Sequence, residues 1–322
     1  MDYTLCREGE FIKHSTINNS SCAIRLWFQE MKSEYKAGGQ NTIFCIEHTG
    51  PYGDVVSRTL DKLNARVWLE SGIQIKRSLG LQRGKSDKID SRRIAEYAFH
   101  FQKKFRRWQN PSRSIEKLRH LLNLRRTVKN QLRHLMMSKG DSIPAHNKSL
   151  QKEIGRLCQD IIRPLNAGLD KIDLEIKSLI KNDLELNHLF KIVTSVSYVG
   201  DIVAEELLVC TNGFKNFNSA KKFACYCGVA PFEHSSGSSI HKKARVSKIA
   251  NKRIKSLLHM PALGSITKNA EFRPYYERKI AEGHAGMSVL NAVKNKIIKR
   301  IFACVRDDRL YMKEREVTKL VN

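Results

Sequence analysis

The chain has 322 residues, and 58 Lys and Arg residues against 32 Asp and Glu residues give it a formal net charge of +26. This length allows two or three domains, and a positive excess spread along the whole chain favours a polyanionic partner, most commonly nucleic acid. No apolar run approaches the roughly 18–20 residues that span a bilayer, and no signal-peptide pattern is recognisable, which argues against a membrane protein and predicts a cytoplasmic one.

The first part of the chain, residues 1–108, alternates strand-like and helix-like segments. Strands are predicted at 3–6, 11–17, 42–46 and 66–69, and helices at 21–35, 52–63 and 87–100. Such alternation predicts an α/β layer fold for this part.

The middle part, residues 109–187, has a different pattern. Apolar residues recur at steps of three and four from Ile115 to Leu135 and, after a break at 140–144, from Leu150 to Leu179. These steps are typical of a coiled-coil seam. We therefore expect a long helical hairpin that packs on itself or on a second copy of the chain.

The last part, residues 188–322, is predicted to be mainly short helices. Residues 192–208 have the form helix, Gly-containing turn, helix, with Gly200 in the turn. Such a turn can offer backbone N–H groups to a phosphate, and it is equally typical of a packed helical corner. Further helices are predicted at 214–228 and 248–258, with two more inside 271–307.

A hydroxyl cluster, Ser235-Ser236-Gly237-Ser238-Ser239, stands directly before a cationic run. Residues 234–270 contain no Asp or Glu and eight Lys or Arg residues. Attack on a phosphodiester requires an exposed hydroxyl and nearby positive groups, so the segment is typical of a nucleophilic site. The alternative is a Ser/Gly loop followed by a solvated basic helix. The candidate nucleic-acid-binding residues are Lys242, Lys243, Arg245, Lys248, Lys252 and Arg253.

Carboxylates are scarce in this basic chain, so their positions are informative. Glu47 ends a short apolar strand, and Asp87 and Asp90 lie three residues apart at the start of a predicted helix. Three such groups can converge on Mg²⁺, which prefers carboxylate and phosphate oxygens. The alternative is that Asp87 is the N-cap of the helix and Asp90 a first-turn carboxylate.

Several segments together resemble one family. They are Ile46–Gly53, Lys85–Ala95, Phe223–Pro231, Ser235–Gly237, Val246–Arg253 and Phe272–Tyr276. In this order and spacing they resemble insertion-sequence transposases that join an acidic RuvC-like domain to a serine-bearing transposase domain, the bridge-RNA-guided recombinases. The resemblance implies an RNase H/RuvC-like α/β domain over 1–108, a helical coiled-coil hairpin over 109–187, and a mainly α transposase domain with a helix-hairpin-helix-like start over 188–322.

The resemblance also implies a role for each candidate residue. Glu47, Asp87 and Asp90 match the last three members of a four-carboxylate metal site for Mg²⁺. Ser236 matches the nucleophile that forms a phosphoserine with cleaved DNA, with Ser235 as the alternative. The implied partners are DNA, a structured guide RNA, and further copies of the chain in a homodimer or homotetramer.

The start of the chain departs from the family pattern. The family opens with a strand that ends in the first metal-binding Asp, whereas Asp2 matches a later, non-catalytic position. A chain without that strand would lack a carboxylate and a central strand, which exposes unpaired strand edges. Either the true start lies upstream or the copy has decayed. We expect this 322-residue form to be weak or inactive in strand exchange.

The leading functional prediction is a DNA transposase or site-specific recombinase, with a DNA invertase as a close variant. A second prediction is a Mg²⁺-dependent resolvase or nuclease in which water, and not Ser236, attacks the DNA. A third is a non-catalytic nucleic-acid-binding remnant, which would show salt-dependent binding without chemistry.

Overall fold

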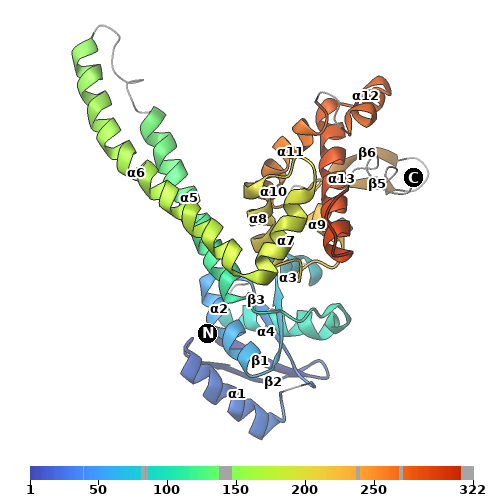
Figure 1. The fold of residues 1–322 in the computed structure, drawn as a ribbon. Coiled ribbons are helices and arrows are strands. Elements are labelled where there is room, and N and C mark those ends of the chain that lie inside the picture. The colour runs from blue at the N-terminus through green and yellow to red at the C-terminus, as the bar shows by residue number, and fades with distance from the viewer. Residues whose placement is uncertain are drawn as a thin grey trace. The chain divides into compact units, whose positions relative to one another are not determined.

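The computed structural model describes residues 1–38, 40–80, 84, 86–137, 147–236, 240–247, 249–267 and 271–312. They belong to two compact units, Met1–Asn110 and Pro111–Asn322, both drawn in Figure 1. Within these described ranges, every helix is too short or too polar to cross a lipid bilayer.

The first unit is mixed α/β. Its elements are β1 (Asp2–Arg7), β2 (Glu10–Thr16), α1 (Ser21–Tyr35), β3 (Ile43–Glu47), α2 (Pro51–Lys62), β4 (Arg66–Glu70), α3 (Gly72–Ser78), α4 (Asp87–His100) and the 3₁₀ helix Gln102–Lys104. The strands and helices predicted for this part are confirmed, with ends that move by one or two residues. The short helix α3 was not predicted.

The strands of this unit form two separate pairs among the described residues. β1 and β2 make an antiparallel hairpin, and β3 and β4 pair in parallel, from Ile43 opposite Arg66 to Glu47 opposite Glu70. The parallel pair needs a crossover connection, which α2 supplies. Helix α4 packs against both β1 and β3. It therefore lies beside the strand that carries Glu47.

Two apolar clusters hold the first unit together. One joins Trp27 and Met31 of α1 to Leu60 of α2, and the other joins Trp68 of β4 to Tyr97 of α4. The indole ring of Trp68 and the phenol ring of Tyr97 have centroids 5.4 Å apart. This contact fixes α4 against the end of β4.

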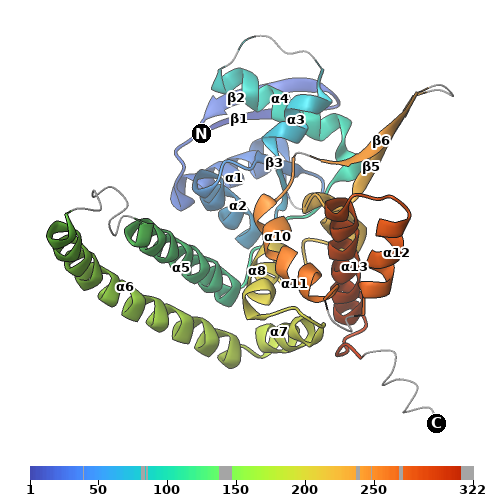
Figure 2. The same ribbon diagram turned by 90° about the horizontal axis from the view of Figure 1, so that it is seen from above.

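The second unit is mostly helical and contains one strand hairpin among the residues described. Its elements are α5 (Arg113–Met137), α6 (Lys148–Asn182), α7 (Leu184–Ser195), α8 (Asp201–Thr211), α9 (Ala220–Tyr226), β5 (Pro231–Ser236), β6 (Ile240–Val246), α10 (Lys252–Leu257), α11 (His259–Gly264), α12 (Arg273–Ala281) and α13 (Gly286–Arg306). Helices α5 and α6 run side by side as a hairpin, which Figures 1 and 2 both show.

One end of this helical hairpin shares a core with the helices that follow it. The buried residues of this cluster are Ile115, Leu118, Leu122, Ile176, Ile180, Leu186 and Leu208. They come from α5, α6, α7 and α8. The hairpin, predicted as a part of its own, thus belongs to the same compact unit as the C-terminal helices.

Two helices of the second unit are shorter than predicted. The helix expected at 214–228 begins only at Ala220, because Asn212 and Phe214 have φ of +53° and +64° and turn the chain after α8. The helix expected at 248–258 begins at Lys252, where the side chain of Asn251 accepts a hydrogen bond from the backbone N–H of Ile254 at 3.1 Å.

The first part of the cationic run after the serines, Ile240–Val246, is the strand β6, whereas Lys252, Arg253 and Lys255 lie on the short helix α10. The alternative interpretation of a basic helix is therefore wrong for the first part of the run and holds for its end. β5 and β6 pair antiparallel, from Pro231 opposite Val246 to Ser236 opposite Ile240. Pairing between the two strands satisfies the backbone groups of this first part.

Candidate functional site

The two parallel strands of the first unit end at acidic residues. Glu47 of β3 and Glu70 of β4 are direct partners in the register, so both lie at the carboxyl edge of the pair. Glu70 was not among the predicted site residues. The signal that selected Glu47, a carboxylate directly after an apolar strand, applies equally to Glu70.

The carboxylate of Glu47 lies against the backbone of Gly72 at the start of α3. A Cβ atom placed on Gly72 would collide with the Glu47 carboxylate oxygen Oε1. The missing side chain of Gly72 therefore makes room for Glu47, and this position tolerates only glycine without a rearrangement.

Glu70 is held by neutral hydrogen-bond donors. Its carboxylate accepts the backbone N–H of Ser71 at 2.9 Å and the Tyr97 hydroxyl at 3.1 Å. Burial and the charge of Glu70 together raise the pKa of Tyr97 to about 12. The phenol therefore stays protonated near neutral pH and acts as the donor.

Asp87 and Asp90 lie in the first turn of α4. The N-cap of this helix is Ser86, whose hydroxyl oxygen accepts the Ile89 N–H at 3.2 Å. The alternative interpretation of Asp87 as the N-cap is thus wrong. Asp90 forms an ion pair with Arg93, one turn further on, at 3.0 Å.

The structure does not assemble the predicted metal site. Within the described ranges, no three His, Cys, Asp or Glu side chains form a group that could hold a metal ion. Asp90 is engaged with Arg93, and Glu47 lies over Gly72. Carboxylate oxygens are suitable ligands for Mg²⁺, but the arrangement of Glu47, Asp87 and Asp90 does not fit the ion.

The predicted nucleophile lies at the end of the strand hairpin. Ser236 is the last residue of β5 and pairs with Ile240, while Ser235 pairs with His241. Residues 237–239 lie outside the described residues, and so does Lys248. Three of the predicted binding residues are on the second strand of the hairpin, β6: Lys242, Lys243 and Arg245.

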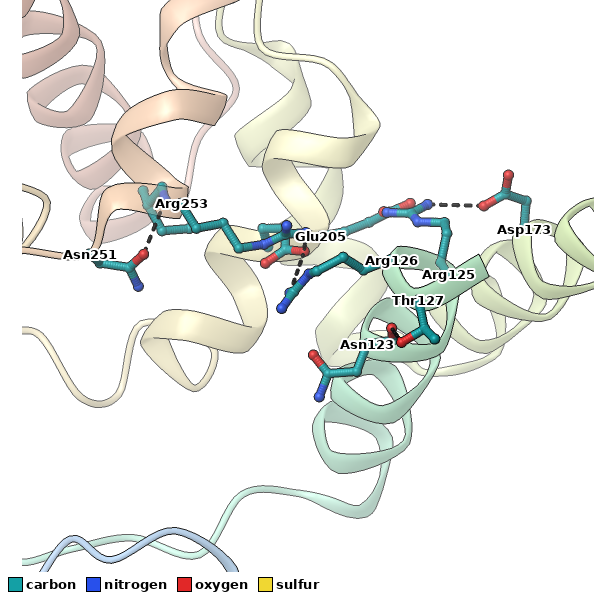
Figure 3. Close-up of polar contacts among 10 residues, drawn as sticks. Asn123, Arg125, Arg126, Thr127, Asp173, Glu205, Asn251 and Arg253 are labelled. Carbon is teal, nitrogen blue, oxygen red and sulfur yellow. Dashed lines mark hydrogen bonds and ion pairs between the residues drawn. The ribbon is translucent and has the colours of Figure 1, made fainter. Parts of the chain in front are cut away.

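The other two predicted binding residues are on α10 and differ from one another. Lys252 is exposed. Arg253 forms a short ion pair with Glu206 of α8, a carboxylate that is 6% exposed. Arg126 of α5 approaches the same carboxylate oxygen at 3.6 Å. Arg126 and Arg253, both labelled in Figure 3, come from different helices. The guanidinium group of Arg253 is therefore paired with a buried carboxylate inside the protein.

A second buried ion pair lies beside the first and was not predicted. Arg125 of α5 forms a short contact with Glu205 of α8 and a 3.0 Å contact with Asp173 of α6 (Figure 3). Burial opposes the charge on Arg125, but hydrogen bonds to Glu205 and Asp173 raise its pKa above the usual value. Burial raises the pKa of Glu205, and Arg125 opposes that rise. These contacts join the helical hairpin to α8.

Three of the cysteines, Cys45, Cys210 and Cys227, do not offer a competing nucleophile. All eight are free thiols, and a thiol attacks only as the thiolate. Burial raises the pKa of Cys45 to about 12 and that of Cys210 to about 11. Burial raises the pKa of Cys227 as well. These three thiols are therefore protonated near neutral pH.

Comparison with known proteins identifies the two halves of the chain. Residues 3–137 match the family described as "Transposase", the DEDD type of IS110, and residues 191–277 match the "Transposase IS116/IS110/IS902 family". The chain belongs to the IS110/IS116/IS902 transposases. This membership implies DNA binding and a DNA recombination or transposition activity, and the DEDD domain implies the use of a divalent metal ion.

Several relatives are similar over long stretches. The "Pilin gene-inverting protein" of Moraxella bovis is 28% identical over 311 residues, covering 94% of this chain and 93% of the relative. The protein of the same name from Moraxella lacunata is 27% identical over 315 residues, with the same coverage. An insertion element IS110 uncharacterized 43.6 kDa protein of Streptomyces coelicolor is 31% identical over 156 residues, covering 47% of this chain and 38% of the relative.

Proposed function

We propose that this transposase cuts and rejoins DNA through the hydroxyl of Ser236, with Ser235 as the alternative nucleophile. The serine oxygen attacks the phosphorus, displaces a deoxyribose hydroxyl and holds the DNA as a phosphoserine until a second DNA hydroxyl displaces the serine. The observation that carries this proposal is the position of Ser236 at the end of β5, paired with a strand that bears three cations. Positive groups near the attacked phosphate stabilise the developing charge.

The DEDD domain also implies the use of a divalent ion. Glu47, Asp87 and Asp90 are the candidates to hold Mg²⁺. Because their arrangement does not fit the ion, no chemical step is assigned to it. Metal dependence is therefore a separate question from the role of Ser236.

Site-specific DNA inversion is the second candidate reaction. Two relatives that align with 94% of this chain are named pilin gene-inverting proteins. Inversion and transposition share the cutting and rejoining of DNA and differ in the arrangement of the recombining sites. Incubation with a plasmid that carries inverted sites distinguishes the two by the orientation of the intervening segment.

We also propose that the protein acts as a homodimer or homotetramer with a guide RNA. Helix α6 leaves Leu150, Leu157 and Ile161 exposed by 41%, 57% and 51%. Their spacing of seven and four residues places them on one face of the helix, and a second copy of α6 is the partner that this face suits. The net charge of +26 suits an RNA as well as a DNA load.

The test of this function is the replacement of Ser236 by Ala. We expect Ser236→Ala to abolish covalent protein–DNA adducts on denaturing gels and to leave DNA binding intact, with Ser235→Ala as the matched control. Adducts that persist in Ser236→Ala and vanish in Ser235→Ala move the role to Ser235. Mg²⁺-dependent cleavage that is indifferent to both substitutions supports a resolvase or nuclease, and salt-dependent binding without cleavage supports a binding protein.

A further inference from the structure

Two arginines from different helices share one buried carboxylate. The Nη2 atom of Arg126 on α5 and the Nη2 atom of Arg253 on α10 both approach the oxygen Oε1 of Glu206, a buried residue of α8. Helix α8 packs against both α5 and α10. Because one oxygen contacts both groups, Glu206 holds the two guanidinium groups side by side.

The contacts leave these two arginines with an excess of positive charge. Two guanidinium groups face a single carboxylate, and the nearby acids Glu205 and Asp173 are held by Arg125 instead. Each guanidinium carries several N–H donors, and the Nε atoms of Arg126 and Arg253 have no hydrogen-bond acceptor among the residues described. The carboxylate of Glu206 therefore satisfies only part of their donors.

Both side chains also face solvent. The side chains of Arg126 and Arg253 are 40% and 36% exposed, whereas that of Arg125, which pairs with Glu205, is 8% exposed. An arginine that serves only to connect helices buries its guanidinium group with its partner, as Arg125 does. The exposed sides of Arg126 and Arg253 can bind a further anion, and Glu206 keeps the two groups together for it.

Cations continue along α5 on both sides of Arg126. Arg119 and Arg133 lie seven residues before and after it, which is about two helical turns or roughly 10 Å in each direction on the same face. Residues 117–137 include no Asp or Glu. On α10, the exposed Lys252 directly precedes Arg253. A row of cations suits a polymer with regularly spaced phosphates better than a single free anion.

We propose that Arg126 and Arg253 together bind one phosphate group of the DNA backbone. The phosphate oxygens accept hydrogen bonds from the exposed sides of both guanidinium groups, a geometry for which arginine is well suited. Such a contact positions the DNA and carries no sequence information. The inference deepens the proposed function, because it rests on DNA binding by the transposase, but it does not depend on the role of Ser236.

The test is the binding of a short DNA duplex to the whole protein at several salt concentrations. In Arg126→Gln, Arg253 still neutralises Glu206, so the fold should be kept. We expect roughly tenfold weaker binding, because a charge-assisted hydrogen bond is lost. The slope of log K against log salt should also fall by about 1.

Lys117→Gln is the matched control. It removes an exposed cation from the same helix, nine residues before Arg126 and therefore on the opposite face. We expect its affinity and its salt dependence to stay close to those of the wild type. An equal loss in Lys117→Gln would overturn the proposal, because the effect of Arg126 would then reflect net charge alone.

Arg253→Gln is an independent second variant. Since both arginines are proposed to contact the same phosphate, it should show a loss of affinity and salt dependence similar to that of Arg126→Gln. Urea unfolding of each variant checks that the fold is intact. Wild-type binding by either folded variant contradicts the proposal, and Arg126→Gln alone decides if Arg253→Gln does not fold.

Ser236→Ala separates this site from the proposed reaction. It should bind DNA with wild-type affinity and salt dependence and should form no covalent adduct, while Arg126→Gln should still form adducts when DNA saturates it. Wild-type binding by Arg126→Gln, with adducts absent in Ser236→Ala, would overturn the phosphate site and leave the reaction standing. Weakened binding by Arg126→Gln, with adducts persisting in Ser236→Ala, would support the site and remove Ser236 from its role.

Discussion

Glu70 of the first unit and the neighbouring acids Glu205 and Glu206 of the second are held by different partners. Glu70 accepts hydrogen bonds from a backbone N–H and a phenol, whereas Glu205 and Glu206 are buried against arginines. A carboxylate that faces an arginine has its charge neutralised and connects helices. One that faces neutral donors has no counter-charge among its partners and remains available to a cation. The partner, and not the burial alone, therefore separates a structural acid from a candidate ligand.

The largest effect is expected at the arginine-paired carboxylates. Replacing Arg125 by Met leaves Glu205 buried without a counter-charge, and we expect a loss of about 3–5 kcal/mol in the free energy of unfolding, measured with urea. Lys117→Met is the matched control, since Lys117, also on α5, forms an exposed 3.2 Å pair with Glu175 of α6. We expect it to cost less than about 1 kcal/mol. Equal losses of unfolding free energy in the two variants would show that the buried Arg125 pair and the exposed Lys117 pair contribute equally to stability.

An intermediate effect is expected where Glu47 lies over Gly72. Gly72→Ala introduces a methyl group into the space of the Glu47 carboxylate. Because this carboxylate is the end of a flexible side chain that can shift, we expect a loss at the lower end of the about 1–3 kcal/mol that overpacking costs. Glu47→Ala combined with Gly72→Ala should recover most of that loss, because the methyl group then has room. Unfolding midpoints of the single and double variants check this. Additive losses would mean that the two residues do not touch.

The smallest effect concerns Asp183, an acid of the second unit held by neutral donors. The Ser114 hydroxyl and the backbone N–H of Leu186, which lies 2.9 Å from the carboxylate, lower the pKa of Asp183 below its usual 3.8. Because the folded pKa is lowered, the stabilisation is present above pH 3.8 and is lost as the pH falls through the folded value. Asp183→Ala should cost about 1 kcal/mol at pH 7, measured by urea unfolding.

That difference should shrink as the pH is lowered toward 3, because the wild type then loses the same charge. Asp183→Asn, which keeps an acceptor at the helix N-terminus but removes the charge, separates capping from electrostatics. A loss that is constant over the whole pH range would assign the contribution of Asp183 to capping alone.

The local elements follow from the amino-acid sequence alone. Strands such as Ile43–Glu47 and helices such as Ser21–Tyr35 follow from apolar period and from caps within a few residues. The positions of Glu47 at the end of β3 and of Asp87 and Asp90 at the start of α4 could be predicted for the same reason. So was the helical hairpin, because each of its helices carries a continuous apolar stripe.

Which partners these residues contact depends on how the elements pack in three dimensions. Glu47 lies opposite Glu70 because β3 and β4, which α2 connects, pair in parallel. The ion pair between Arg253 and Glu206 joins residues from α10 and α8. Residues Ile240–Val246 of the cationic run form a strand because β5 pairs with them, and Asn251 caps the helix that carries the rest of the run. Contacts between residues far apart in the sequence depend on packing and charge in three dimensions, and local periodicity carries no information about them.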